Sequence, residues 1–232
     1  MAYRHLFFDL DHTLWDFDAN SRLTLQELYV SEELKKRGVH DFDLFHKNYL
    51  LYNDKLWERY RNGHIKAEEL RWKRMWLTLV DFKIGDEKLA RYLGQRFVDM
   101  LPCRTLLFPD TIEVLQYLTD KNYSLHLITN GFEEVQHNKI RNSGIAPFFR
   151  EVITSEGSNS LKPRKEIFDY AFQKAGASPS ESIILGDSLE ADILGGINAG
   201  IDQVHVNHLN AGPGSITPTY TVYSLKELKG IL

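Results

Sequence analysis

The sequence predicts an α/β fold, in which a doubly wound parallel sheet carries an inserted domain of four helices. From residue 109 onward, apolar runs of strand length alternate with amphipathic segments, which requires a parallel sheet with helices on both faces. Between residues 20 and 100, apolar residues recur only at helical spacing. A single apolar strand precedes this helical stretch and must join the later strands, because it cannot bury itself alone.

The first strand ends in a turn that carries two acids. Leu6, Phe7 and Phe8 form an unbroken apolar run, typical of a strand that is buried on both faces. Asp9 follows where the strand would emerge, and Asp11 comes two residues later. At roughly 4.5 Å and an effective dielectric of about 20, such charges repel by about 3–4 kcal/mol. The pair therefore indicates a bound cation or a shared proton, unless both acids simply cap a turn.

The helical stretch is predicted to form a domain of its own. Short joints marked by Gly or Asp separate its helices, and Ser21 is a plausible cap for the first of them. The predicted helices span residues 21–38, 42–63, 67–82 and 86–101. The domain boundaries follow: the inserted cap is residues 17–101, and the core is residues 1–16 and 102–232.

The rest of the core is predicted as alternating elements. Helices are expected at residues 109–118, 133–142, 163–175 and 191–199. Strands are expected at residues 123–129, 151–154, 182–185, 203–206 and 219–222. The third helix has Pro163 at the early position that proline favours.

Polar residues stand where predicted strands end or helices begin. Thr129 and Asp187 each follow an apolar run, and Lys162 precedes a helix. Open α/β sheets bind ligands at the carboxyl ends of their strands. We therefore expect these three side chains to gather with Asp9 and Asp11 at one edge of the sheet.

This order of motifs resembles the haloacid dehalogenase-like (HAD) hydrolase superfamily, and the resemblance spans most of the chain. The matching motifs are Asp9-Leu10-Asp11-His12-Thr13, Thr129, Lys162, and Gly186-Asp187-Ser188 with Asp192. The stretch DLDHTLWDFD, residues 9–18, is also similar to pyrimidine-type 5′-nucleotidases that act on non-standard nucleotides. The resemblance implies a helical cap over a Rossmann-like core.

The resemblance also implies roles for three residues. Asp9 would be the nucleophile that forms an aspartyl-phosphate, which divides a hard hydrolysis into two easier steps. Asp11 would be the general acid and base. A halide leaving group needs no proton, so an acid at this position favours phosphoryl transfer over dehalogenation. Lys162 would hold the phosphate and balance the charge of Asp9.

The implied metal is Mg²⁺, which prefers hard oxygen ligands. Its ligands would be Asp9, the backbone carbonyl of Asp11, and Asp187. Asp192 would not contact the metal directly, but would bind it through water or orient Lys162. Favourable charge at a helix N-terminus is the other reading of Asp192.

The phosphate oxygens would be held by Thr129, by Lys162 and by the amides of Asn130 and Gly131. The glycine lets the backbone approach closely, and the helix that follows adds a favourable dipole.

Substrate contacts are less specific in the sequence. Trp15 and Phe132 are aromatic candidates near the expected site, and core packing is the alternative for both. Arg71 in the third cap helix is a candidate cation, and a solvated helix arginine is the alternative.

The overall composition limits the kinds of partner. The chain has 232 residues, a net charge of −4 and a pI of about 6.1, which gives no general attraction to nucleic acid polymers or anionic membranes. One cysteine excludes an intramolecular disulfide. We found no signal-peptide pattern and no apolar run of membrane-spanning length. These features predict a cytoplasmic protein. The resemblance implies a small phosphate ester as its partner, and we expect a monomer or homodimer.

The favoured activity is therefore Mg²⁺-dependent phosphomonoester hydrolysis, with a nucleoside 5′-monophosphate as the first candidate substrate. The alternatives within the fold are a sugar-phosphate phosphatase and a phosphoglucomutase-type phosphoryl transfer. A phospho-signalling receiver and a catalytically silent binding protein are alternatives of a different class. Receivers, however, place the phosphorylated Asp on a later strand and lack an inserted helical domain.

Overall fold

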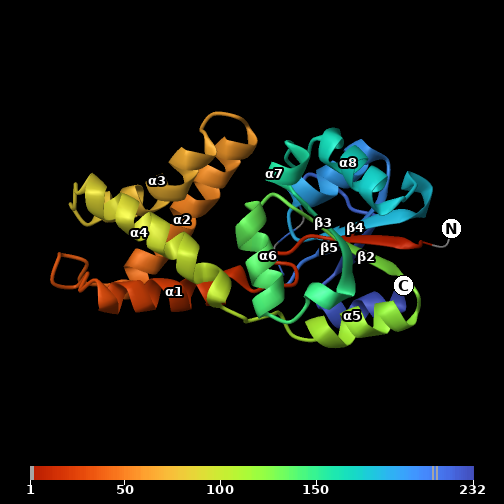
Figure 1. The fold of residues 1–232 in the computed structure, drawn as a ribbon, viewed down its shortest axis with the longest axis horizontal. Coiled ribbons are helices and arrows are strands. Elements are labelled where there is room, and N and C mark those ends of the chain that lie inside the picture. Colours follow the sequence, from red (N-terminus) through yellow and green to blue (C-terminus); the bar gives the residue numbers. More distant parts are fainter. Residues whose placement is uncertain (1–2, 211, 213) are drawn as a thin grey trace. The chain divides into compact units, whose positions relative to one another are not determined.

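The computed structural model describes residues 3–210, 212 and 214–232. The chain divides into two compact units. The first comprises the chain up to residue 17 and from residue 105 onward, and the second comprises residues 18–104. The α/β architecture predicted from the sequence is confirmed (Figure 1). Whether the second unit works as a cap during turnover stays a prediction.

The first unit is built on a six-stranded parallel sheet with the order β3-β2-β1-β4-β5-β6. The strands are β1 (His5–Phe8), β2 (Ser124–Thr129), β3 (Phe149–Thr154), β4 (Ser182–Gly186), β5 (Asp202–Val206) and β6 (Tyr220–Val222). The first strand is central, with β2 on one side and β4 on the other. In this register Phe8 lies beside Leu127 and Leu185, so the residues that follow emerge together at one edge.

Helices cover both faces of the sheet. They are α5 (Thr111–Asp120), α6 (Glu133–Asn142), α7 (Ser155–Ser158), α8 (Lys165–Ala175) and α9 (Leu194–Ala199). A π-helical turn spans Leu189–Ile193, and 3₁₀ helices span Leu101–Cys103, Ala146–Phe148, Pro179–Glu181 and Leu225–Gly230. On one face, Phe7, Ile128 and Ile184 pack against Ile167 and Phe168 of α8. In Figure 1, α5 lies on the opposite side of the sheet from α8. Because β1, β2 and β4 are almost wholly buried, their apolar side chains form the core that fixes the strand ends.

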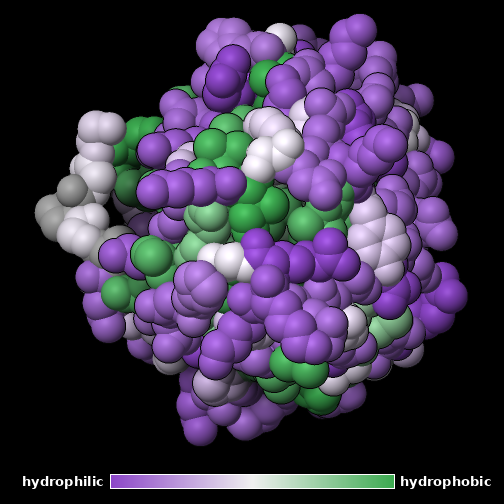
Figure 2. Space-filling view, turned by 90° about the vertical axis from the view of Figure 1, so that its left-hand side faces the viewer, coloured by the Kyte–Doolittle hydropathy of each residue, from purple (hydrophilic) through white to green (hydrophobic). Residues whose placement is uncertain are grey.

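The second unit contains four long helices: α1 (Phe17–Ser31), α2 (Phe42–Arg61), α3 (Ala67–Asp81) and α4 (Glu87–Met100). Asp41 caps α2 by accepting a hydrogen bond from the Leu44 amide at 3.0 Å. Helices α3 and α4 approach closely at Gly94, where an added Cβ would lie 3.0 Å from the Arg71 carbonyl oxygen. The face of the molecule that Figure 2 draws is mostly hydrophilic, with a group of apolar side chains near its centre.

Several predicted helix bounds were wrong. Helix α5 begins at Thr111 and not at residue 109, and α9 begins at Leu194, because the π-helical turn takes up residues 189–193. Helix α1 ends at Ser31 and not at residue 38. Helix α1 begins at Phe17 and not at Ser21, which is buried inside the helix and donates its hydroxyl to the Asp18 carbonyl at 3.0 Å. The helix predicted from Pro163 begins at Lys165, because Arg164 has extended backbone angles. Among the described residues, no helix is both long enough and apolar enough to cross a membrane.

Candidate active site

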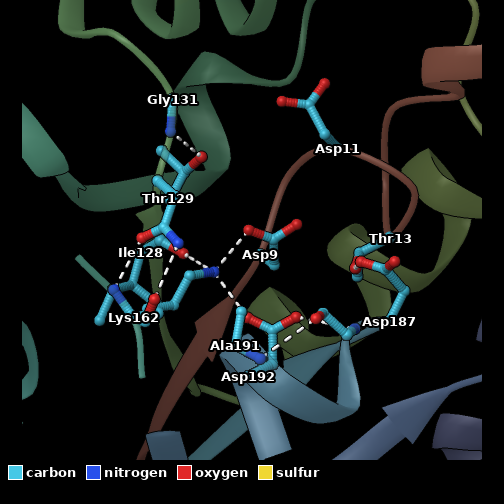
Figure 3. A network of polar contacts seen from close by, with 12 residues as sticks. Asp9, Asp11, Thr13, Ile128, Thr129, Gly131, Lys162, Asp187, Ala191 and Asp192 are labelled. Atoms are coloured by element: carbon cyan, nitrogen blue, oxygen red, sulfur yellow. Dashed lines mark hydrogen bonds and ion pairs between the residues drawn. The ribbon is translucent and has the colours of Figure 1, made fainter. Parts of the chain in front are cut away.

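The site is centred on Lys162, which is 1% exposed. Its Nζ donates to Asp9 Oδ1 at 2.6 Å, to Asp192 Oδ1 at 2.6 Å and to the Ile128 carbonyl at 2.7 Å (Figure 3). An ammonium group has three donors, so every N–H is used. The structure thus brings together a lysine and two acids that lie 153 and 30 residues from it in the chain.

Asn130 fixes the segment that carries this lysine. Its Oδ1 accepts from the Lys162 amide at 2.7 Å, and its Nδ2 donates to the Lys162 carbonyl at 3.0 Å. The end of β2 is thereby tied to the loop before α8. The sequence assigned Asn130 to phosphate only through its backbone amide, and the role of its side chain was missed.

Three carboxylates form a cluster beside the lysine. Asp9, Asp187 and Asp192 each offer an oxygen within 4.8 Å of the others. Asp192 Oδ2 accepts from the Ser188 amide at 3.0 Å, and Asp187 Oδ1 accepts from the Thr13 hydroxyl at 3.2 Å. Both oxygens of Asp192 are therefore engaged, by Lys162 and by backbone, whereas Lys162 contacts Asp9 through Oδ1 alone.

Gly186 makes room for this arrangement. A Cβ added there would lie 2.2 Å from Asp192 Cγ, so any other residue would push the carboxylate aside. Sequence reasoning named this glycine within its motif but gave it no role.

The cluster carries three acids against one ammonium group. Burial raises the pKa of Asp9 to about 8 against the opposing effect of Lys162, and Asp192 and Asp187 raise it further. Burial and Asp192 likewise raise the pKa of Asp187. Burial by itself would lower the pKa of Lys162, but Asp192 and Asp9 outweigh it and the net shift is upward. Hard oxygen donors with excess negative charge are the chemistry that Mg²⁺ prefers, so these residues fit such an ion.

Asp11 lies at the same sheet edge, but its carboxylate points away from Asp9 and Asp187 (Figure 3). Lys139 Nζ donates to both of its oxygens, at 2.6 and 2.9 Å, and Gln136 Nε2 donates to Oδ2 at 2.9 Å. Neither residue of α6 was found from the sequence. The only available signal was their three-residue spacing, which places both on one face of a helix.

The predicted phosphate-binding segment follows β2. Thr129 is 2% exposed, and its hydroxyl accepts from the Gly131 amide at 3.1 Å and from Gln136 Nε2 at 2.8 Å. A Cβ at Gly131 would lie 2.3 Å from the Gln136 side chain, so the position requires glycine. Helix α6 begins two residues later, and its N-terminus therefore lies close to this segment.

The weaker substrate candidates are more dispersed. Trp15 is fully buried, and Lys139 Nζ lies 4.5 Å from the centre of its ring. Phe132 precedes α6 and is 5% exposed. Arg71 lies on α3, in the second unit.

The family is decided by a model described as haloacid dehalogenase-like hydrolase, which matches residues 3–200. The chain belongs to this family. The family resemblance stated from the motifs is therefore confirmed, and the chain is a hydrolase of the HAD-like type.

This HAD-like hydrolase is similar to named relatives over nearly its full length. It is 35% identical to pyrimidine 5′-nucleotidase PynA of Streptococcus pneumoniae (strain ATCC BAA-255 / R6), across 98% of this chain and 94% of that protein. It is 33% identical to pyrimidine 5′-nucleotidase YjjG of Escherichia coli (strain K12), across 100% and 99% of the two chains. The solved structure of the HAD-hydrolase YfnB from Bacillus subtilis, bound to magnesium, matches with a TM-score of 0.90. That match has 30% identity and covers 100% of this chain and 99% of the other.

Proposed function

We propose that this HAD-like hydrolase is a Mg²⁺-dependent phosphomonoesterase whose substrate is a nucleoside 5′-monophosphate, with pyrimidine nucleotides preferred. One observation carries the chemistry. The Asp9 carboxylate is held through one oxygen by a buried lysine, beside Asp187, at the carboxyl edge of a parallel sheet. This is the arrangement that an oriented carboxylate nucleophile requires.

Asp9 acts as the nucleophile. Because Lys162 holds Oδ1, Oδ2 is the oxygen that attacks phosphorus, and the bond from phosphorus to the ester oxygen breaks. Asp11, in its protonated form, gives a proton to the departing alkoxide oxygen, and the resulting carboxylate then takes a proton from the water that hydrolyses the aspartyl-phosphate. Thr129 and the Gly131 amide, which bond to each other here, hold the phosphoryl oxygens.

Asp9, the Asp11 carbonyl and Asp187 are the residues that would hold Mg²⁺. The ion supplies neutralisation of the clustered acids and of the substrate phosphate. The magnesium-bound structure of YfnB supports this choice of metal.

The nucleotide preference rests on the two relatives named as pyrimidine 5′-nucleotidases, at 35% and 33% identity over nearly the whole chain. The core residues act on the phosphate alone, so they do not distinguish one phosphomonoester from another.

Phosphate release from purified protein tests the proposal, with and without Mg²⁺. The panel holds pyrimidine and purine nucleoside monophosphates, sugar phosphates and a sugar bisphosphate. We expect Mg²⁺-dependent release that is fastest with a pyrimidine nucleotide, and its abolition by Asp9→Asn but not by Asp120→Asn, an exposed acid on α5. Normal turnover by Asp9→Asn would refute the mechanism. Faster release from sugar phosphates would refute the nucleotide preference, and isomer formation from the bisphosphate would indicate a mutase.

A further inference from the structure

Helix α6 holds the carboxylate of Asp11 at three points. Lys139 Nζ contacts both carboxylate oxygens, at 2.6 and 2.9 Å, and Gln136 Nε2 contacts one of them at 2.9 Å. Lys139 is 3% exposed and Gln136 is 1% exposed. We call this pair the Asp11 clamp.

The clamp is specific to Asp11. Among the described residues, Asp11 is the one carboxylate within ion-pair distance of Lys139. The remaining neighbours of this ammonium group include the rings of Trp15 and Phe17, at 4.5 and 5.8 Å. A buried cation is costly unless it is paired, so the pairing with Asp11 is what makes Lys139 tolerable at this position.

Gln136 links the clamp to the phosphate-binding segment. Its Nε2 donates both to Asp11 Oδ2 and to the Thr129 hydroxyl, which is a proposed phosphate contact. One side-chain amide therefore spans the proposed general acid and the proposed phosphate site. The glycine at 131 leaves the space that this amide occupies.

The backbone around Asp11 is fixed independently of the clamp. Asp11 forms a bridge with Trp15, and the amide of Leu14 donates to the Leu10 carbonyl at 3.0 Å. With its backbone held, the position of the Asp11 carboxylate depends on rotation about its side-chain bonds. The residues that set this rotation are those of the clamp.

We propose that Lys139 and Gln136 are positioning residues for the general acid. They hold the Asp11 carboxylate in one defined orientation beside Thr129, off the cluster of Asp9 and Asp187, until the substrate is bound. Without the clamp, this carboxylate would be free to bind the cation that the cluster would hold and to occupy a position that the substrate phosphate needs. The inference rests on the proposed function, because Asp11 is taken as the acid of that reaction.

A double-mutant cycle tests whether Lys139 acts through Asp11. We expect Lys139→Met to lower kcat on the preferred nucleotide by about tenfold or more, with KM within about twofold, as for loss of positioning. Lys139→Arg, which keeps the cation, should recover most of the rate. Arg141→Met on the same helix, an exposed position, should match the wild type. In the Asp11→Asn background, Lys139→Met should cost nothing further.

Two results of this cycle overturn the proposal. One is an unchanged or raised kcat in Lys139→Met. The other is a full additional loss when Lys139→Met is combined with Asp11→Asn, which would mean that the lysine acts independently of the acid.

A measurement without turnover separates this inference from the proposed function. In NMR spectra of ¹⁵N-lysine-labelled protein, the Lys139 ammonium group should give a signal protected from exchange, assigned by its absence in Lys139→Met. The signal should be lost in Asp11→Ala and retained in Asp120→Ala. If the wild-type protein releases no phosphate, the proposed function is refuted. The Lys139 signal would still show whether the lysine is paired with Asp11. An unprotected signal in the wild type would refute the clamp itself.

Discussion

Replacing Lys162 with methionine should leave the acids of the site without their cation while keeping the apolar stem filled. At 2.6 Å and an effective dielectric of about 20, each of the pairs with Asp9 and Asp192 corresponds to about 6 kcal/mol of Coulomb attraction. Desolvation offsets much of this, and breaking a buried pair typically costs about 3–5 kcal/mol. Since domains are stable by about 5–15 kcal/mol, Lys162→Met should lose a large part of the free energy of unfolding.

A second substitution shows whether uncompensated charge is the cause. Asp192→Asn removes one acid but keeps an acceptor for the Ser188 amide. Urea unfolding, followed by circular dichroism without divalent metal, should show that Lys162→Met/Asp192→Asn is more stable than Lys162→Met alone. If the second substitution instead lowers stability further, the loss reflects packing, and the charge argument fails.

Three further predictions concern the strand ends, acid stability and metal. Gly186→Ala should displace Asp192, since the new Cβ would lie 2.2 Å from its Cγ, and phosphate release should fall by about tenfold or more. The control Gly85→Ala, with open space around the added Cβ, should have little effect. Burial, helped by His5, lowers the pKa of His126 from 6.5 to about 4, so the unfolded chain binds the proton more readily. The free energy of unfolding should therefore be highest above pH 6.5, where His126 is neutral in both states, and should fall by on the order of 2 kcal/mol as the pH drops toward 4. In urea unfolding, His126→Phe should show a smaller loss of stability over the same pH range. Mg²⁺ at about 100 times its Kd should stabilise the wild type by about 2.7 kcal/mol in thermal or urea unfolding, and Asp187→Asn, which removes a proposed ligand, should show a much smaller gain; equal gains would contradict that assignment.

The sequence predicted the sheet and the convergence of the acids for a physical reason. Buried parallel strands read as continuous apolar runs, and residues after such runs must emerge at one edge. Asp9 and Asp187 are placed by that rule, and the structure brings an oxygen of each within 4.8 Å of the other. Lys162, which precedes a helix, contacts Asp9 at 2.6 Å. Helix starts were less predictable. Serine is a residue type that often caps helices, but the Ser21 hydroxyl donates to a carbonyl oxygen within the helix.

Side-chain orientation was beyond prediction, because it depends on partners that no local pattern identifies. Asp11 is placed correctly on the chain by its motif, yet the direction of its carboxylate is set by residues 125 and 128 positions later. Those residues, Gln136 and Lys139, lie on a helix whose composition is that of an ordinary solvated surface. Their importance arises only when folding brings α6 beside the turn that follows β1. The same folding step that assembles the proposed nucleophile and metal ligands therefore also determines where the proposed acid points, and a substitution on α6 can alter the chemistry without touching a motif residue.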